Sequence, residues 1–392
     1  MTNSNDERRK ALTSHEAPLA DEPATVKSTP LSVITGFLGS GKTTTLSHLL
    51  ADPRMNRTAV IINEFGEMGL DHLLVARPRE DVILLANGCL CCTVRGELVD
   101  TLSELFVARA RGEIMDFDRI VVETTGLADP VPVLRTAHFD EDLGSLLHLE
   151  NVITTVDAVH GLEQIASHPE CMKQICTADT VLITKTDLAD RTQIERLRSV
   201  IDEFNPGVAQ IEVLNGRVLP DQLFDTLSPQ ALQTARLPKW LAASGEKHSH
   251  AHAPHDHHHH HHHGHAAHHR EGITSFPVFI DRPVTATGLQ IWTQMLSDFN
   301  GADLLRIKGI VNIEGRPYVL QAVQHLIHPL AELPEWPSDD RRSQLIFITR
   351  NISRADIEET LHALQFDLPK KPAAGFDAEG FRRFSELAGT FR

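Results

Sequence analysis

Short apolar runs alternate with helical patterns over the first half of the chain. The apolar runs lie at 31–35, 59–62, 82–85, 120–122, 152–156 and 181–183. Such continuous runs are typical of parallel strands, because both faces of the sheet are covered. Helical patterns lie between several of them, at 43–50, 95–110 and 191–204. Repeated strand–helix units predict an α/β domain with a parallel sheet and helices on both faces.

The pattern stops after about residue 237 and resumes in a different order. From His248 to His269 the chain has 14 histidines in 22 positions, a composition that cannot build a packed core. Strand-like runs follow at 276–280, 304–313, 318–323 and 345–349, with helical patterns at 288–299 and 355–364. That order predicts a smaller α+β domain with an antiparallel sheet.

These changes divide the 392 residues into four predicted parts. Residues 1–29 form a disordered tail, since they are polar and lack the apolar segment of a secretory signal. Residues 30–237 form the α/β domain, 238–271 the histidine-rich linker and 272–380 the α+β domain.

The first apolar run leads into Gly-Phe-Leu-Gly-Ser-Gly-Lys-Thr at 36–43, a full match to the phosphate-binding loop G-x-x-x-x-G-K-[ST]. Backbone N–H groups and the following helix N-terminus cradle phosphates in such a loop. Lys42 is placed for the β- and γ-phosphates, and the hydroxyl of Thr43 for Mg²⁺. The alternative is a chance glycine-rich turn, which the flanking strand and helix disfavour. The predicted nucleotide-binding residues are Gly36, Gly39, Ser40, Gly41, Lys42, Thr43 and Thr44.

Two further motifs follow in the order that a GTPase requires. The run at 119–126, Arg-Ile-Val-Val-Glu-Thr-Thr-Gly, is a strand that ends in an acid, the Walker B arrangement. Glu123 would hold Mg²⁺ or its water, and the N–H of Gly126 would sense the γ-phosphate. The alternative is an ordinary strand and turn with a surface acid.

The third motif, Thr-Lys-Thr-Asp at 184–187, predicts the choice of base. Asp187 can accept from the N1–H and exocyclic amine of guanine, and the stem of Lys185 can cover the ring. Adenine lacks that pair of donors, so GTP and GDP are the expected ligands.

Three of the five cysteines, Cys89, Cys91 and Cys92, lie between the first two motifs. Thiolates are soft ligands that suit Zn²⁺ and Cu(I), and Gly88 permits an irregular loop. The alternative is a buried trio of small apolar residues. Cys171 and Cys176 are interpreted as core or surface thiols on a helical segment. The spacing is poor for disulfides, which favours a reducing, cytoplasmic compartment.

Charge and composition limit the classes of partner that we expect the chain to bind. A formal net charge of −16 argues against a nucleic-acid partner, and no apolar run approaches the about 18 residues of a membrane span. The histidine tract has three interpretations: a weak metal site, which we favour, a solvated spacer or an affinity tag.

Together with Asn-Glu-Phe-Gly-Glu at 63–67 and Leu-Leu-Arg-Ile-Lys-Gly at 304–309, these motifs resemble the CobW family of P-loop GTPases over about residues 31–349. The family is related to the nickel-insertion GTPases of urease and hydrogenase, and the C-x-C-C element is its most specific mark. The resemblance implies a GTPase metallochaperone for zinc, with cobalt as the alternative metal. Some members are assigned to cobalamin synthesis or to the activation of nitrile hydratase.

The resemblance also implies residue roles. Cys91, with Cys89 and Cys92, would supply metal thiolates, and Glu67 an oxygen ligand. Glu64 would lie in a switch region near Mg²⁺ or its waters. The sequence departs from the family at two positions: Thr184 stands where the guanine motif usually has Asn, and Ile62 stands where some relatives carry an acid.

The expected function is a GTP-driven handoff of metal to a metal-requiring client protein, by a monomer or homodimer. GTP and Mg²⁺ would order the switch segments and hydrolysis would release them, which changes the metal affinity. A histidine-rich metal buffer or sensor, in which GTP is structural, is a second class. An ATP-dependent kinase or synthetase is a third, which Asp187 disfavours.

Overall fold

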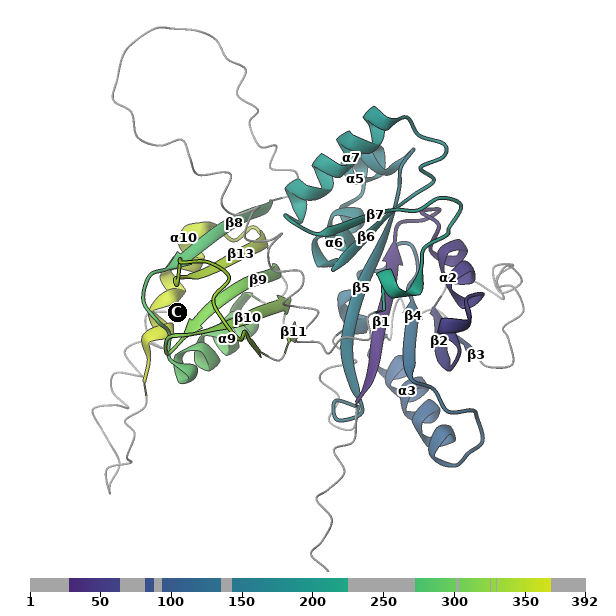
Figure 1. Ribbon diagram of the computed structural model, residues 1–392, viewed down its shortest axis with the longest axis horizontal. Coiled ribbons are helices and arrows are strands. Elements are labelled where there is room, and N and C mark those ends of the chain that lie inside the picture. The colour runs from purple at the N-terminus through teal and green to yellow at the C-terminus, as the bar shows by residue number, and fades with distance from the viewer. Residues whose placement is uncertain are drawn as a thin grey trace, which may run out of the picture.

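The computed structural model describes residues 28–63, 82–87, 94–134, 143–224, 272–300, 303–324, 326–328 and 330–367. Within these residues the chain forms a parallel sheet and an antiparallel sheet, each with its own helices (Figure 1). The predicted fold class is therefore confirmed: an α/β P-loop domain precedes a smaller α+β domain.

The first domain is built on a seven-stranded sheet in which every neighbouring pair is parallel. The strand order is β3-β2-β4-β1-β5-β6-β7, so β5, β6 and β7 follow one another outward on one side of β1, and on the other side β4 is inserted between β1 and β2. Ligands bind such sheets beyond the carboxyl ends of the strands, where the order reverses. The strands are β1 Thr29–Gly36, β2 Thr58–Asn63, β3 Val82–Asn87, β4 Arg119–Glu123, β5 Leu147–Asp157, β6 Thr180–Thr184 and β7 Ala209–Glu212.

Successive residues of the central strands enter different cores, which explains why the strands appear as unbroken apolar runs. Val33 and Ile61 pack on one face with Leu102 of α3, whereas Ile34 and Val60 pack on the other with α2. Helices α5, α6 and α7 share a third cluster with Val181 and Ile183 of β6. The helices are α2 Lys42–Leu50, α3 Val94–Ala110, α5 Gly161–Ser167, α6 Pro169–Thr177 and α7 Arg191–Phe204, with short 3₁₀ helices at Pro53–Met55 and Pro220–Gln222.

The second domain has the sheet order β11-β10-β9-β13-β8, with β12 beside β10. Helix α9 packs on one face through Trp292, which is fully buried, meets Phe347 edge-on and donates its indole N–H to Thr360 (2.8 Å). The elements are β8 Ile273–Ile280, α9 Ala286–Asn300, β9 Leu304–Ile313, β10 Arg316–Val323, β11 Leu326–Ile327, β12 Ala331–Glu332, β13 Ser343–Arg350, α10 Arg354–Thr360 and a 3₁₀ helix Leu361–Gln365.

The two domains meet along β9, in which every residue is buried. Leu305 and Ile273 join the cluster of helices α6 and α7, and Val323 joins the cluster of α3. Figure 1 shows the green strands β8 and β9 on the side of the parallel sheet where α6 lies.

Each strand and helix that the apolar pattern predicted is present. The pattern did not predict β7, α5 or the two-residue strands β11 and β12. Strand β7 is only four residues long and partly exposed, so it carries no apolar run. The predicted tail 1–29 lies outside the described residues up to residue 27, and the predicted linker 238–271 lies outside them throughout.

Candidate functional site

The predicted phosphate-binding loop connects β1 to α2. Gly36, Gly39 and Gly41 all have positive φ, at 141°, 72° and 92°. A Cβ at Gly36 would lie 2.3 Å from Oγ1 of Thr155, so no other residue fits there without displacing β5. Residues of this kind turn backbone N–H groups toward a common centre, which is how such a loop binds an anion.

Lys42 begins helix α2 and is buried beneath this loop. Its ammonium donates to the carbonyl oxygens of Gly36 (2.9 Å) and Phe37 (3.2 Å). Phosphate oxygens are stronger acceptors than carbonyls, so a bound phosphate would compete for these donors. Ser40 is held by Oγ1 of Thr155 at 2.6 Å, and Thr44 is exposed in the first turn of α2.

Thr43 and Glu123 come together from two different motifs. Glu123 is the last residue of β4 and pairs in register with Ile34 of β1, which brings it to the start of α2. The hydroxyl of Thr43 donates to Oε1 of Glu123 at 2.6 Å, and the carboxylate is buried. A hydroxyl and a carboxylate are hard oxygen ligands, so this pair fits Mg²⁺.

The chain after Glu123 returns directly to the phosphate-binding loop. The N–H of Thr124 donates to the carbonyl of Ile34 at 2.9 Å, and its hydroxyl donates to Thr35 at 2.8 Å. A Cβ at Gly126 would lie 2.6 Å from Cδ2 and 2.7 Å from the backbone nitrogen of Leu38. Only glycine allows this close approach, which puts the residue predicted to sense the γ-phosphate against the loop that binds it.

The Thr-Lys-Thr-Asp segment also contacts the phosphate-binding loop. The hydroxyl of Thr184 donates to the carbonyl of Ser40 at 2.7 Å, so Thr braces the loop where the motif usually has Asn. Lys185 has a left-handed φ of 56°, and its ammonium donates to Asp157 at 2.6 Å. Asp187 is exposed beyond the end of β6, where a base could reach it.

Two parts of this site were missed by the sequence analysis. Asp157 ends β5, is buried, and accepts from the N–H groups of Val159 and His160 as well as from Lys185. An acid at the end of an apolar run was the signal that could have identified it.

The second missed part is the loop that follows β7, at 213–216. The hydroxyl of Thr186 donates to the carbonyl of Val213 at 3.4 Å, and a Cβ at Gly216 would lie 2.7 Å from the ring of His48 on α2. This loop therefore lies between the guanine motif and α2. The Asn-Gly pair at 215–216 is a turn signal and could have located it.

The predicted zinc ligands Glu67, Cys89, Cys91 and Cys92 lie outside the described residues, as do the predicted switch residue Glu64 and the histidine tract. Within the described ranges, no three His, Cys, Asp or Glu side chains are grouped to hold a metal ion. The structure does describe the strand ends that precede the predicted zinc ligands in the sequence. Asn63 of β2 and Asn87 of β3 are partners in the parallel register, so these two strands end side by side.

Cys171 and Cys176 are confirmed as core thiols on helix α6. Burial raises the pKa of both thiols to about 12. They are poorly suited to bind a metal, because the thiolate is the ligand form. No helix among the residues described above is long and apolar enough to cross a membrane.

Comparison with known proteins agrees with this geometry. The chain matches the CobW/HypB/UreG nucleotide-binding domain over residues 30–212 and the C-terminal domain of the cobalamin synthesis protein cobW over residues 273–365. It is 32% identical over 341 residues to the zinc chaperone YjiA of Escherichia coli strain K12, covering 86% of this chain and 98% of that protein.

Two more relatives extend the comparison. The chain is 29% identical over 360 residues to zinc-regulated GTPase metalloprotein activator 1 of Schizosaccharomyces pombe, covering 86% of each protein. The solved structure of zinc-bound YjiA GTPase from E. coli matches with a TM-score of 0.57 and 26% identity, covering 87% of this chain and 100% of that one.

Proposed function

Because the chain belongs to the CobW family of P-loop GTPases, we propose that it is a metallochaperone, which hydrolyses GTP, binds zinc at its Cys-x-Cys-Cys loop and delivers the metal to a client protein. We propose zinc as the metal because two relatives are a zinc chaperone and a zinc-regulated GTPase that activates metalloproteins. We place this function in the cytoplasm, in a monomer or homodimer, without nucleic acid or membrane.

The contacts of the site support the nucleotide roles that we propose. Lys42 contacts the β- and γ-phosphates, and Thr43 with Glu123 holds Mg²⁺, which neutralises charge on those phosphates when it is bound. Gly126 offers its N–H to the γ-phosphate, and Asp187 accepts from guanine while Lys185 covers the base. The remaining binding residues are Gly36, Gly39, Ser40, Gly41, Thr44 and Thr184, with Glu64 in a switch segment.

One observation carries the link between nucleotide and metal: the register at the carboxyl ends of β2, β3 and β4. Ile62 of β2 is the partner of Glu123 on one side and of Ala86 on the other. The predicted ligands follow these strands closely in sequence, with Glu67 four residues after Asn63 and the cysteines from two residues after Asn87.

We therefore place the zinc ligands Glu67, Cys89, Cys91 and Cys92 beside the Mg²⁺ end of the nucleotide. GTP orders the segments between the two sites and hydrolysis releases them, so the zinc affinity changes with the nucleotide. By linkage, zinc must change the nucleotide affinity by the same factor. The client then receives zinc from the weaker-binding state.

Two features favour other functions. The second domain matches the C-terminal domain of a cobalamin synthesis protein, which favours cobalt insertion with cobalt as the metal. Activation of nitrile hydratase is the further alternative that the family resemblance implies. The histidine tract favours a metal buffer or sensor in which GTP is structural. The domain boundaries that we propose are the same whichever of these functions is correct. They are the tail 1–29, the GTPase domain 30–237, the linker 238–271 and the C-terminal domain 272–380.

Steady-state GTP hydrolysis with Zn²⁺, with Co²⁺ and without metal tests the proposed function. We expect slow turnover that changes more with Zn²⁺ than with Co²⁺ and that Lys42→Ala abolishes. Turnover at the wild-type rate in folded Lys42→Ala protein would overturn the P-loop assignment. A GTP hydrolysis rate that is the same with and without Zn²⁺ would favour the function as a metal buffer or sensor.

A further inference from the structure

Gln174 of helix α6 holds the loop that contains Gly126. Its side-chain amide donates to the carbonyl oxygens of Gly126 (3.3 Å) and Ala128 (3.0 Å), on either side of Leu127. The Gln174 side chain is buried, with 1% of its surface exposed. Gln174 thus holds the loop by the backbone carbonyls of Gly126 and Ala128. The same loop packs against Leu38 at Gly126.

The N-terminal end of α6 contacts the phosphate-binding loop. The ring of His168, the residue before the helix, stacks on Phe37 with a centroid separation of 4.5 Å and an interplanar angle of 29°. Phe37 lies between Gly36 and Leu38, so one end of α6 rests on the loop that binds phosphate.

The C-terminal end of α6 contacts the second domain. Arg306 of β9 is fully buried and donates to the carbonyl of Thr177 and to Asp179. Lys308 of β9 is buried and donates to Asn205 (2.8 Å), whose own amide donates to the carbonyls at the end of α6. Cations are favoured at a helix C-terminus, and breaking such a buried pair is costly.

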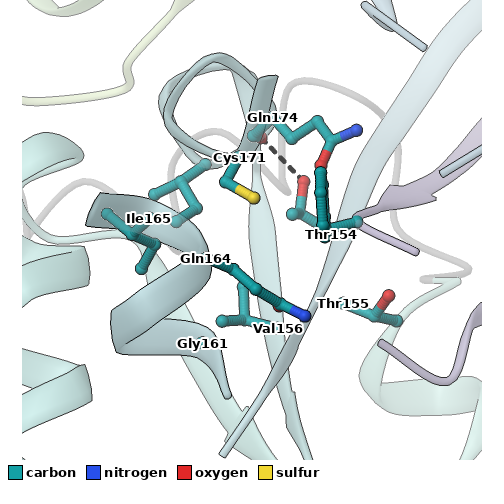
Figure 2. A pocket seen from close by; sticks show the side chains of 10 residues that line it. Thr154, Thr155, Val156, Gly161, Gln164, Ile165, Cys171 and Gln174 are labelled. Atoms are coloured by element: carbon teal, nitrogen blue, oxygen red, sulfur yellow. Dashed lines mark hydrogen bonds between the residues drawn. The ribbon is translucent and has the colours of Figure 1, made fainter. Parts of the chain in front are cut away.

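Helix α6 also borders a small pocket. The pocket lies between α5, α6 and β5, lined by Phe37, Gln164, Cys171 and Gln174 among others, and Figure 2 shows the side chains around it. Most of α6 is buried in the cluster that it shares with α5 and α7, and close-packed elements of this kind transmit strain.

Resting on the proposed function, in which Gly126 senses the γ-phosphate, we propose that α6 couples this loop to the C-terminal domain, with Gln174 as the positioning residue. A change at Gly126 or Phe37 displaces α6, and Arg306 and Lys308 carry that displacement into β9. The C-terminal domain thereby responds to the nucleotide. The alternative is a core glutamine that only satisfies two buried carbonyls.

The first experiment compares the variant Gln174→Leu with the control variant Gln164→Leu. Gln164 lines the same pocket but lies on α5 (Figure 2). We expect Gln174→Leu to lower kcat for GTP about tenfold and to weaken a non-hydrolysable GTP analogue, while GDP affinity changes less than about twofold. GDP lacks the phosphate that the Gly126 loop meets. Gln164→Leu should leave all three unchanged. Equal weakening of GDP and the GTP analogue, or an unchanged kcat, would overturn the positioning role.

The second experiment needs no substitution. Hydrogen–deuterium exchange of the wild-type chain is measured with GDP and with the non-hydrolysable GTP analogue, at residues 169–177 and 304–313. We expect exchange to be several-fold slower in both segments with the GTP analogue. Identical exchange with the two nucleotides would overturn the coupling. Hydrolysis of GTP by the wild-type chain and its loss in Lys42→Ala test the GTPase assignment separately.

Discussion

The hydroxyl of Thr43 donates to Oε1 of Glu123 across 2.6 Å, which joins the helix of the phosphate-binding loop to the end of β4. The two residues are 80 positions apart in the sequence. Parallel pairing of β1 with β4 brings them together, because it aligns Ile34 with Glu123 two residues before the loop begins. The Mg²⁺ ligands of the proposed site are therefore positioned by the sheet itself.

Removing the Thr43 hydroxyl should impair hydrolysis through Mg²⁺. We expect Thr43→Ala to lower kcat at least about tenfold, about 1.4 kcal/mol of barrier, and to raise the Mg²⁺ concentration required for half-maximal rate. Ser47→Ala is the matched control, because Ser47 lies one turn later on α2 and its hydroxyl donates to the carbonyl of Thr43 (2.7 Å). An equal loss in both variants would show that helix α2, and not metal binding, was damaged.

Asp187 should select guanine. Asp187→Asn replaces an acceptor with a donor that faces the donors of guanine, so GTP affinity should fall about 100-fold, or about 2.7 kcal/mol. Affinity for xanthosine triphosphate should rise, because its ring presents an acceptor there. Asp190→Asn is the control, since Asp190 caps helix α7 and Asn caps equally well. Unchanged GTP affinity in Asp187→Asn would place the base elsewhere.

The five cysteines should separate into two classes toward a thiol reagent at neutral pH. Burial raises the pKa of Cys171 and Cys176 to about 12, so almost no thiolate is present at neutral pH and both should react slowly. In metal-free native protein we expect three fast thiols, and five after denaturation. Zinc should protect the three fast ones. Three thiols that stay fast with zinc bound would exclude the cysteine loop as the metal site.

Deleting residues 248–269 should reduce the number of metal ions bound but preserve one tight site and GTP hydrolysis. The tract contains no core-forming residues, so its loss should unfold neither domain. Metal stoichiometry and turnover are measured beside a variant in which a Gly/Ser segment of equal length replaces the tract. Loss of all metal binding in both variants would make the tract the principal site.

The sequence predicted the elements that are defined by local pattern. Each strand that is buried on both faces, such as β1, whose run at 31–35 precedes the loop, was visible as an apolar run. The phosphate-binding loop was visible because its glycines and Lys42 are contiguous. Thr43 and Glu123 were predicted separately as Mg²⁺ ligands, each from its own motif, and their hydrogen bond is a finding of the structure.

Contacts between distant segments could not be predicted in the same way. Arg306 and Lys308 lie in a strand whose sequence reads as apolar with two surface charges, yet both are buried against α6 and α7. Their burial depends on Asp179 and Asn205, which are more than 100 residues away. Gln174 gave no signal for the same reason, since its two acceptors lie 46 and 48 residues earlier.

The central claim is that the nucleotide changes how tightly zinc is held at the cysteine loop, and one titration tests it directly. Zinc affinity is measured by chelator competition on wild-type and Cys91→Ser protein, each loaded with a non-hydrolysable GTP analogue or with GDP. We predict one tight zinc in the wild type, an affinity that differs at least about fivefold between the two nucleotides, and loss of that zinc in Cys91→Ser with nucleotide binding intact. Equal wild-type zinc affinity with both nucleotides would contradict the handoff, even with the cysteines confirmed as ligands.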